Sequence, residues 1–170
     1  FRWAARTEKS PFGQLIREVP GEDWTDATPF ADTMWRRMQR DFSDSIIGLR
    51  DGAYIKRRYL DHPDRLYRVW RVYGACGARK LGLIVTKAQQ DWWEVLDLVA
   101  RRADLPILVR AALSLAPRGK GLKMWVSDSH AHLVDVCDPE RHDPGVVIPN
   151  SSWSPGPPRE KLQGKWWLTG

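Results

Sequence analysis

The residue types that most often hold metal ions or move protons gather in one short stretch of this sequence. Residues 128–142 include Asp128, Ser129, His130, His132, Asp135, Cys137 and His142. Imidazole, thiolate and carboxylate groups are the usual ligands of zinc. His130 and His132 are two residues apart, and side chains with this spacing point the same way on a strand but not on a helix. Residues 127–129 are good helix N-caps and Asp138-Pro139 is a stop signal, so we predict a short helix here and no metal site.

The motifs of several large enzyme classes are missing from the sequence. It has no Gly-x-Ser-x-Gly nucleophile elbow, no His-Glu-x-x-His zinc motif and no Walker loop. Cys76 and Cys137 belong to no Cys-x-x-Cys pair, which favours two reduced, buried thiols over a disulfide or a zinc site. No apolar run has the length of a membrane span. We therefore expect a cytoplasmic protein without a membrane partner.

Positive charge is concentrated in residues 50–80. This segment holds nine Lys and Arg residues against three Asp, and that excess equals the whole net charge of +6. Such a patch attracts phosphate groups, including those of nucleic acids or of a CoA-like ligand. Base stacking could use the tyrosines that interleave with the basic residues, namely Tyr54, Tyr59, Tyr67 and Tyr73. Their spacing agrees better with packing between a helix and a sheet, so nucleic acid is not the partner that we expect.

Hydrophobic periodicity and turn residues predict eleven helices and strands. A helix that starts at Thr28-Pro29 carries an apolar stripe at three- and four-residue spacing, made of Ala31, Met34, Trp35, Met38 and Phe42. Strands are predicted at 13–19, 66–73, 78–86, 92–99, 122–126, 146–148 and 165–169, and helices at 28–42, 51–60, 104–116 and 128–137. The order β-α-α-β-β-β-α-β-α-β-β indicates an α/β fold with a mixed sheet and helices on both faces.

This element order resembles that of the GNAT superfamily of acyl-CoA-dependent N-acyltransferases over nearly the whole chain. The run from Arg50 to Pro63, followed by Tyr67, is similar to an RD..YL.WRY..HP...Y stretch of bacterial GNAT-family proteins. In those proteins the stretch lies in the C-terminal part of a longer chain, after a more typical GNAT domain. The closing residues 165–170 are similar to their C-terminal strand. The sequence begins at Phe1 without a methionine, so we expect residues 1–170 to be a single GNAT-like domain excised from a longer chain.

The resemblance implies where an acyl-CoA would bind. GNAT enzymes hold the pantetheine beside the fourth strand and the pyrophosphate on backbone N–H groups where that strand enters the next helix, an anion site that glycines help to form. The family pattern there is Gln/Arg-x-x-Gly-x-Gly/Ala, and the matching positions are Arg101, Arg102, Ala103, Asp104 and Leu105. This sequence supplies arginines but no glycine at these positions. The carboxylate of Asp104 would repel phosphate, and the proline that follows Leu105 removes an N–H donor.

Three further comparisons with the GNAT pattern concern a second glycine loop and two acid–base residues. The run 118–121, Arg-Gly-Lys-Gly, follows a predicted helix and precedes a predicted strand, the reverse of the required order, so we expect a helix-ending turn. Many GNAT enzymes use a Glu on the fourth strand to take the proton of the amine, and Glu94 matches that position. The alternative for Glu94 is a salt-bridged or exposed strand residue. The general-acid Tyr that is frequent in the family has no counterpart within 128–138.

Two functions are compatible with these residues. The first is an acyl-CoA-dependent N-acyltransferase domain that uses acetyl-CoA or another acyl-CoA, no metal, and a small-molecule or peptide amine as acceptor. The second is a GNAT-like domain without catalysis that packs on and supports a neighbouring catalytic domain of the same chain. The missing glycines favour the second function for this domain alone.

Overall fold

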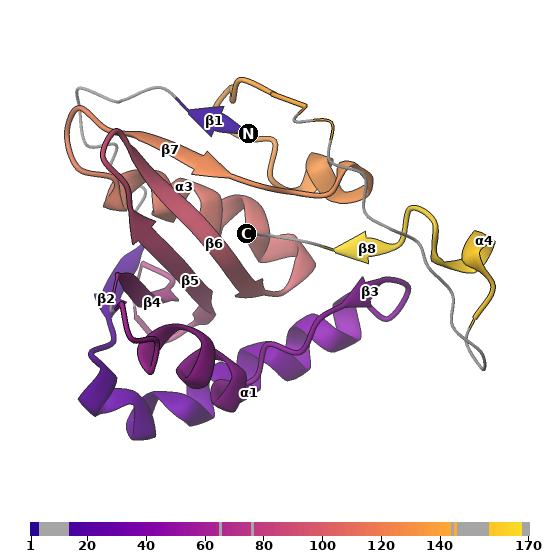
Figure 1. Cartoon of the computed structure of the whole chain (residues 1–170). Helices are drawn as coiled ribbons and strands as arrows, with labels where there is room; N and C mark the ends of the chain where they lie inside the picture. The colour runs from indigo at the N-terminus through magenta and orange to yellow at the C-terminus, as the bar shows by residue number, and fades with distance from the viewer. Residues whose placement is uncertain (4–13, 65, 76, 144, 146–156, 168–170) are drawn as a thin grey trace.

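A six-stranded mixed sheet forms the centre of the protein (Figure 1). The computed structural model describes residues 1–3, 14–64, 66–75, 77–143, 145 and 157–167. The strands lie in the order β1-β7-β6-β5-β4-β2, with bounds β1 Arg2–Trp3, β2 Leu15–Glu18, β4 Tyr67–Tyr73, β5 Lys80–Ala88, β6 Trp92–Ala100 and β7 Gly121–Met124. Neighbouring strands are antiparallel except β6 and β7, which are parallel. The predicted α/β class with a mixed sheet is confirmed.

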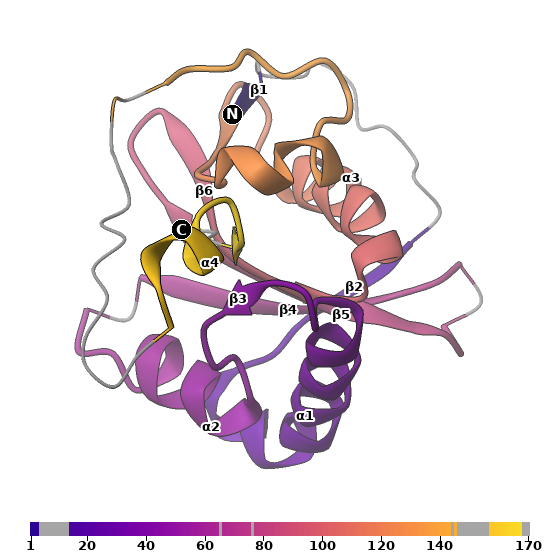
Figure 2. The same ribbon diagram turned by 90° about the vertical axis from the view of Figure 1, so that its right-hand side faces the viewer.

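Helices cover both faces of this sheet (Figure 2). One face packs against α1 and α2, and the other packs against α3. The bounds are α1 Trp24–Asp41, α2 Gly52–Ile55, α3 Leu105–Leu115 and α4 Arg159–Leu162, with a π-helical turn η2 at Lys56–Leu60 and 3-10 turns η1 Gly21–Asp23, η3 Arg102–Asp104 and η4 Asp128–Leu133. The apolar stripe predicted for the first long helix is buried in the core, as expected. Burial of each large side chain contributes about 1.5–3 kcal/mol, which holds α1 on the sheet.

The first long helix begins earlier than its sequence indicates. Thr28 was expected to be its N-cap, but α1 starts at Trp24 and includes Pro29. The hydroxyl of Thr28 donates to the carbonyl oxygen of Trp24 at 2.9 Å, one turn back inside the helix. The buried indole of Trp24 donates to the carbonyl oxygen of Gly52 at 3.1 Å. This tertiary anchor adds a first turn that local capping signals do not reveal.

An irregularity in β6 separates it from its parallel neighbour. On the β5 side, Thr86 pairs with Val95 and Val85 pairs with Asp97, so Leu96 is an extra residue without a β5 partner. On the other side, the pairing of β6 with β7 ends at Val95 and Met124. A β-bulge bends the strand that carries it and ends regular pairing locally. The two parallel strands therefore part at Leu96, just before β6 enters α3.

A second, two-stranded sheet closes the end of the molecule next to this separation. It pairs β3 (Ile46–Ile47) in parallel with β8 (Trp166–Trp167). In Figures 1 and 2, β8 lies between the end of α1 and the η4 turn that follows β7. The predicted last strand thus exists but pairs outside the main sheet. The predicted helix at 128–137 is only the 3-10 turn η4, and the predicted strand at 146–148 lies outside the described residues.

Candidate functional site

The turn between β6 and α3 is the position at which the GNAT pattern places the CoA pyrophosphate. Its first backbone donor, the N–H of Arg102, is already bonded to the carboxylate of Asp41 at 3.1 Å. The same carboxylate oxygen accepts from Nε of Arg101 at 3.3 Å. Asp41 is the last residue of α1, so the end of one helix supplies an anion to the start of another. Carboxylates are favoured at helix N-termini for the same reason that phosphates are.

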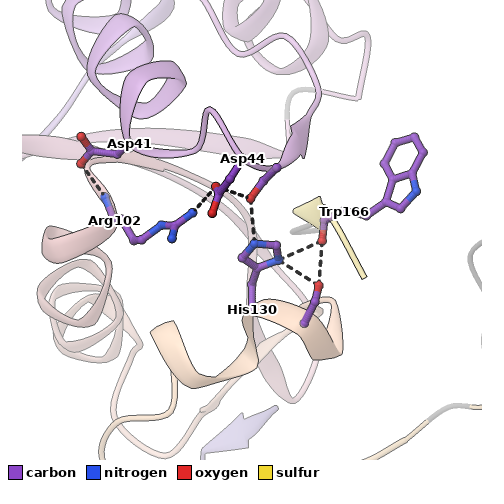
Figure 3. A network of polar contacts seen from close by, with 7 residues as sticks. Asp41, Asp44, Arg102, His130 and Trp166 are labelled. Atoms are coloured by element: carbon purple, nitrogen blue, oxygen red, sulfur yellow. Dashed lines mark hydrogen bonds and ion pairs between the residues drawn. The ribbon is translucent and has the colours of Figure 1, made fainter. Parts of the chain in front are cut away.

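A second carboxylate holds the other arginine of this turn. Nη2 of Arg102 donates to Oδ1 of Asp44 at 2.6 Å (Figure 3). The guanidinium also lies over the ring of Phe42, 4.6 Å from its centroid. Hydrogen bonds from Ser45 and then from Arg102 lower the pKa of Asp44, so this carboxylate is charged at neutral pH. The two arginines expected to meet phosphate are thus paired with acidic residues of the chain itself.

Asp104 and Leu105 are buried rather than available to a ligand. The carboxylate of Asp104 is 2% exposed and accepts from Nη2 of Arg79 at 2.5 Å. Arg79 precedes β5, so this ion pair ties the start of α3 to the β4–β5 hairpin. Leu105 is fully buried in the core. Ala103 is exposed.

Glu94 lies at the other end of β6 from this turn. Seven residues separate it from Arg101, roughly 23 Å along an extended strand. Its carboxylate accepts from Nε2 of Gln89 at 3.2 Å. Its neighbours across the sheet are Lys87 on β5 and Lys123 on β7. The structure therefore does not bring Glu94 together with the Arg101–Leu105 turn.

The run 118–121 forms the helix-ending turn that the sequence indicates. It lies between the end of α3 at Leu115 and the start of β7 at Gly121. The N–H of Lys120 donates to the carbonyl oxygen of Pro117 at 3.1 Å, and Gly119 has a φ of +82° that favours glycine. These glycines shape a tight turn and do not begin a helix.

A buried histidine organises the region beyond β7. His130 in η4 is 7% exposed, and its Nδ1 lies 3.0 Å from the carbonyl oxygen of Trp166 (Figure 3). Its Nε2 lies 3.1 Å from Oγ of Ser45, in the turn between α1 and β3. The imidazole ring contacts the rings of Phe42 and Trp167, with centroids 5.8 Å and 5.5 Å away. Three segments far apart in the sequence therefore meet at this one side chain.

Burial is the main cause that lowers the pKa of His130 from its ordinary value. The carbonyl oxygen of Trp166 opposes this by accepting a hydrogen bond, while the positive charge of Arg102 lowers the pKa further. Asp44 and His132 have smaller and opposite effects. The ring is thus neutral at pH 7, with the proton on Nδ1, because a carbonyl oxygen can only accept.

Sequence reasoning missed a buried ion pair next to the bulge. Asp97 on β6 is 2% exposed, and its Oδ1 lies 2.7 Å from Nε of Arg50. Its Oδ2 accepts from the hydroxyl of Tyr59 at 3.2 Å. Burial and the charge of Asp97 raise the pKa of Tyr59. Asp97 stands between apolar residues in the second half of β6. A carboxylate in such a run needs a partner inside the protein, and this was the signal available in the sequence.

The residues that carry the GNAT resemblance are therefore used within the fold. Arg50 pairs with Asp97, and Asp51 caps α2 by accepting from the N–H of Tyr54 at 2.8 Å. The tyrosines of the basic segment pack on neighbouring aromatic rings as predicted, with Tyr59 edge-on to Tyr67 at 5.5 Å and Tyr73 edge-on to Phe30 at 5.2 Å. This stretch packs η2 against β4 of the sheet.

The ligand-type residues of 128–142 do not assemble. Among the described residues, no group of three or more His, Cys, Asp or Glu could hold a metal ion. Cys137 is a free, half-buried thiol rather than a fully buried one, and Cys76 lies outside the described residues. In the same part of the chain, no helix is both long and apolar enough to cross a membrane.

Comparisons with known proteins include a weak likeness to a solved structure. No protein-family model matches the chain, and no curated protein matches its sequence. A solved structure of a conserved protein of unknown function from Enterococcus faecalis V583, described as a probable N-acyltransferase, superimposes with a TM-score of 0.48 at 11% identity. The match covers 71% of this chain, and the chain spans 30% of that protein.

Proposed function

We propose that this chain is a GNAT-like domain of an acyl-CoA-dependent N-acyltransferase, and that its own acyl-CoA site is closed by its own side chains. In this proposal it supports a neighbouring domain of the same protein instead of transferring an acetyl group to an amine by itself. The observation that carries the proposal is the Asp41 carboxylate on the N–H of Arg102, where a pyrophosphate would bind.

The path of β6 supports the first part of the proposal, that this is a GNAT-like domain. A parallel strand pair that parts at a bulge leaves backbone groups free to bond a ligand, and bulges are frequent next to active sites. Here the parting lies at Leu96, five residues before the turn into α3. This arrangement suits a pantetheine beside β6 and a phosphate at the helix start.

The charged groups at the turn between β6 and α3 support the second part of the proposal, that the acyl-CoA site is closed. The turn presents two arginines, and the guanidinium of each is paired with an acidic residue: Arg101 with Asp41, and Arg102 with Asp44. A pyrophosphate would have to displace these carboxylates and remain close to them. Repulsion between the phosphate and two unpaired carboxylates would cancel much of the gain from the arginines.

Side-chain packing next to the point where β6 and β7 separate also supports a closed acyl-CoA site. Trp167 of β8 is fully buried, and its ring lies 5.1 Å from that of Phe42 at the end of α1. The carbonyl oxygen of the preceding Trp166 accepts from Ser127, just beyond β7, at 2.6 Å. The last strand therefore lies against the segment that follows β7, on the side where β7 has left β6.

The second candidate is that this domain itself binds acyl-CoA and uses Glu94 as the base. The bulge in β6 favours it, because the scaffold for a ligand is present. In that case Asp41 and Asp44 would release Arg101 and Arg102 when the ligand binds. The two candidates differ in one measurable property, the affinity of this domain for acyl-CoA.

Titration of the protein with acetyl-CoA, followed by calorimetry and by melting temperature, tests the proposal. We expect no binding heat and no rise in melting temperature at 1 mM acetyl-CoA. A ligand present at 100 times its dissociation constant would stabilise the folded state by about 2.7 kcal/mol, a rise of roughly 5–10 °C for a chain of this size. Inorganic pyrophosphate at the same concentration is the control for general attraction to the basic surface. A rise with acetyl-CoA that pyrophosphate does not produce would overturn the proposal in favour of the second candidate.

A further inference from the structure

Ser45 and His130 form a second site, separate from Glu94. Ser45 lies in the turn between α1 and β3 and is partly exposed, whereas His130 lies in η4 and is buried. Their side chains are 85 residues apart in the sequence and meet at 3.1 Å between Oγ and Nε2. A hydroxyl within hydrogen-bond reach of an imidazole is the first requirement for an activated serine.

The imidazole is held in the tautomer that a general base needs. Its Nδ1 faces the carbonyl oxygen of Trp166 at 3.0 Å, so Nδ1 carries the proton and Nε2 presents its lone pair to Ser45. The same carbonyl oxygen accepts from Ser127 at 2.6 Å and from Ser129 at 3.2 Å. The carbonyl thus orients the ring as the third member of a catalytic triad does.

A carboxylate that is paired with an arginine lies next to the hydroxyl. Oδ1 of Asp44 accepts from Oγ of Ser45 at 3.0 Å and from Nη2 of Arg102 at 2.6 Å, so the hydroxyl and the guanidinium share this carboxylate oxygen. Within the described part of the chain, Nε of Arg102 is buried and has no hydrogen-bond partner. The guanidinium balances the charge of the Asp44 carboxylate. The hydroxyl of Ser45 can therefore turn from Asp44 to Nε2 of His130 and give up its proton there.

We propose that Ser45 and His130 are a nucleophile and general base that hydrolyse esters with a short acyl group. Oγ of Ser45 bonds to the ester carbonyl carbon while Nε2 of His130 takes the hydroxyl proton. The bond from that carbon to the alcohol oxygen breaks, and His130 returns the proton to the departing alcohol. Water then attacks the acyl-serine with the same base and releases a carboxylic acid. The activity goes beyond the proposed function, since it requires no acyl-CoA, no amine and no opening of the turn at Arg102.

Several charged groups face His130 and set the pH range of this chemistry. Arg102 lies on the α3 side, Asp44 lies in the turn after α1, and His132 lies in η4 itself. Burial and Arg102 lower the pKa of His130, so the basic form predominates at and above neutral pH. Reactivity of Ser45 should therefore rise with pH, with an inflection below the ordinary histidine value of about 6.5.

Labelling with a fluorophosphonate probe tests the pair directly. The purified chain is reacted with the probe, the adduct is located by peptide mass spectrometry, and the rate is followed by intact mass. Initial turnover of p-nitrophenyl acetate is the second readout. The test variants are Ser45→Ala and His130→Asn, and the matched controls are Ser43→Ala in the same turn and His132→Asn in the same η4 segment, both at exposed positions.

We expect an adduct on Ser45, its absence in Ser45→Ala, and unchanged rates in both controls. Loss of the base should slow labelling by roughly 100-fold or more in His130→Asn. The proposal is overturned if the native chain gives no adduct on Ser45, or if His130→Asn reacts as fast as the native chain. Should His130→Asn fail to fold, judged by its melting temperature, the pH profile of the native chain decides. A labelling rate that does not increase with pH anywhere below the ordinary histidine value, over the range in which the chain stays folded, would exclude His130 as the base.

Discussion

Removal of the Asp41 carboxylate tests the closed turn at the start of α3. In Asp41→Ala, the N–H of Arg102 loses its acceptor and Arg101 loses its ion pair. Loss of a helix-capping side chain costs about 1 kcal/mol, and loss of a negative charge at a helix N-terminus costs about 0.5 kcal/mol. The ion pair itself adds little, because the Arg101 side chain is 52% exposed. The expected loss is therefore about 1.5 kcal/mol, or roughly 3–6 °C in melting temperature.

The substitution Asp41→Asn separates the two contributions. Its amide oxygen can still accept from the N–H of Arg102, so it should lose only the charge effect, about 0.5 kcal/mol, and this loss should shrink at high salt. Asp91→Asn in the exposed β5–β6 turn is the control for a general change of net charge. Urea denaturation at low and high salt measures all three variants. If Asp41→Ala is as stable as the native chain at low salt, the carboxylate does not hold the turn and the argument for closure fails.

Other regions of the structure allow sharp tests of stability. Arg50→Met should lower the free energy of unfolding by about 3–5 kcal/mol in urea denaturation, because it leaves the buried charge of Asp97 without its partner. In the native chain the pKa of Tyr59 is raised, so the folded state stays protonated above pH 10 while the unfolded state ionises, and stability falls as pH rises. Tyr59→Phe removes this group and should therefore lose less stability above pH 10. Melting temperatures measured over a series of pH values give the slope for both chains. Gly82→Ala should lower the free energy of unfolding by about 1–3 kcal/mol, since the new Cβ would lie 2.6 Å from the carbonyl oxygen of Val99. Gly21→Ala is the control: its Cβ would lie in open space, so the melting temperature should change little.

Elements with a long local repeat could be predicted from the sequence, and elements of two residues could not. The stripe from Ala31 to Phe42 repeats over three turns of α1, and β4 to β6 are runs of aromatic and branched residues bounded by turns. In contrast, β1 and β3 have two residues each and exist because they pair with β7 and β8, over 100 residues away. A local sequence pattern does not indicate which distant segments of the chain pair with each other. These two strands, and the position of β8 outside the main sheet, were therefore not predicted.

The same reasoning explains which parts of the candidate site were foreseen. The turn at Arg101–Leu105 was located through the resemblance to the GNAT pattern, in which the phosphate loop joins the fourth strand to the next helix, and the structure has a strand-to-helix turn at these residues. What closes it comes from Asp41, which sequence reasoning took only as part of an amphipathic helix, and from Asp44, which it did not single out. The contact of Ser45 with His130 required three segments to meet, and the histidine stood in the sequence as a candidate metal ligand. Its polar neighbours in space are the hydroxyls of Ser45 and Ser129 and a carbonyl oxygen. These groups cannot compete for zinc with thiolates or carboxylates but can orient a proton. The environment of a histidine, rather than its spacing from the next one, therefore decides between ligand and base.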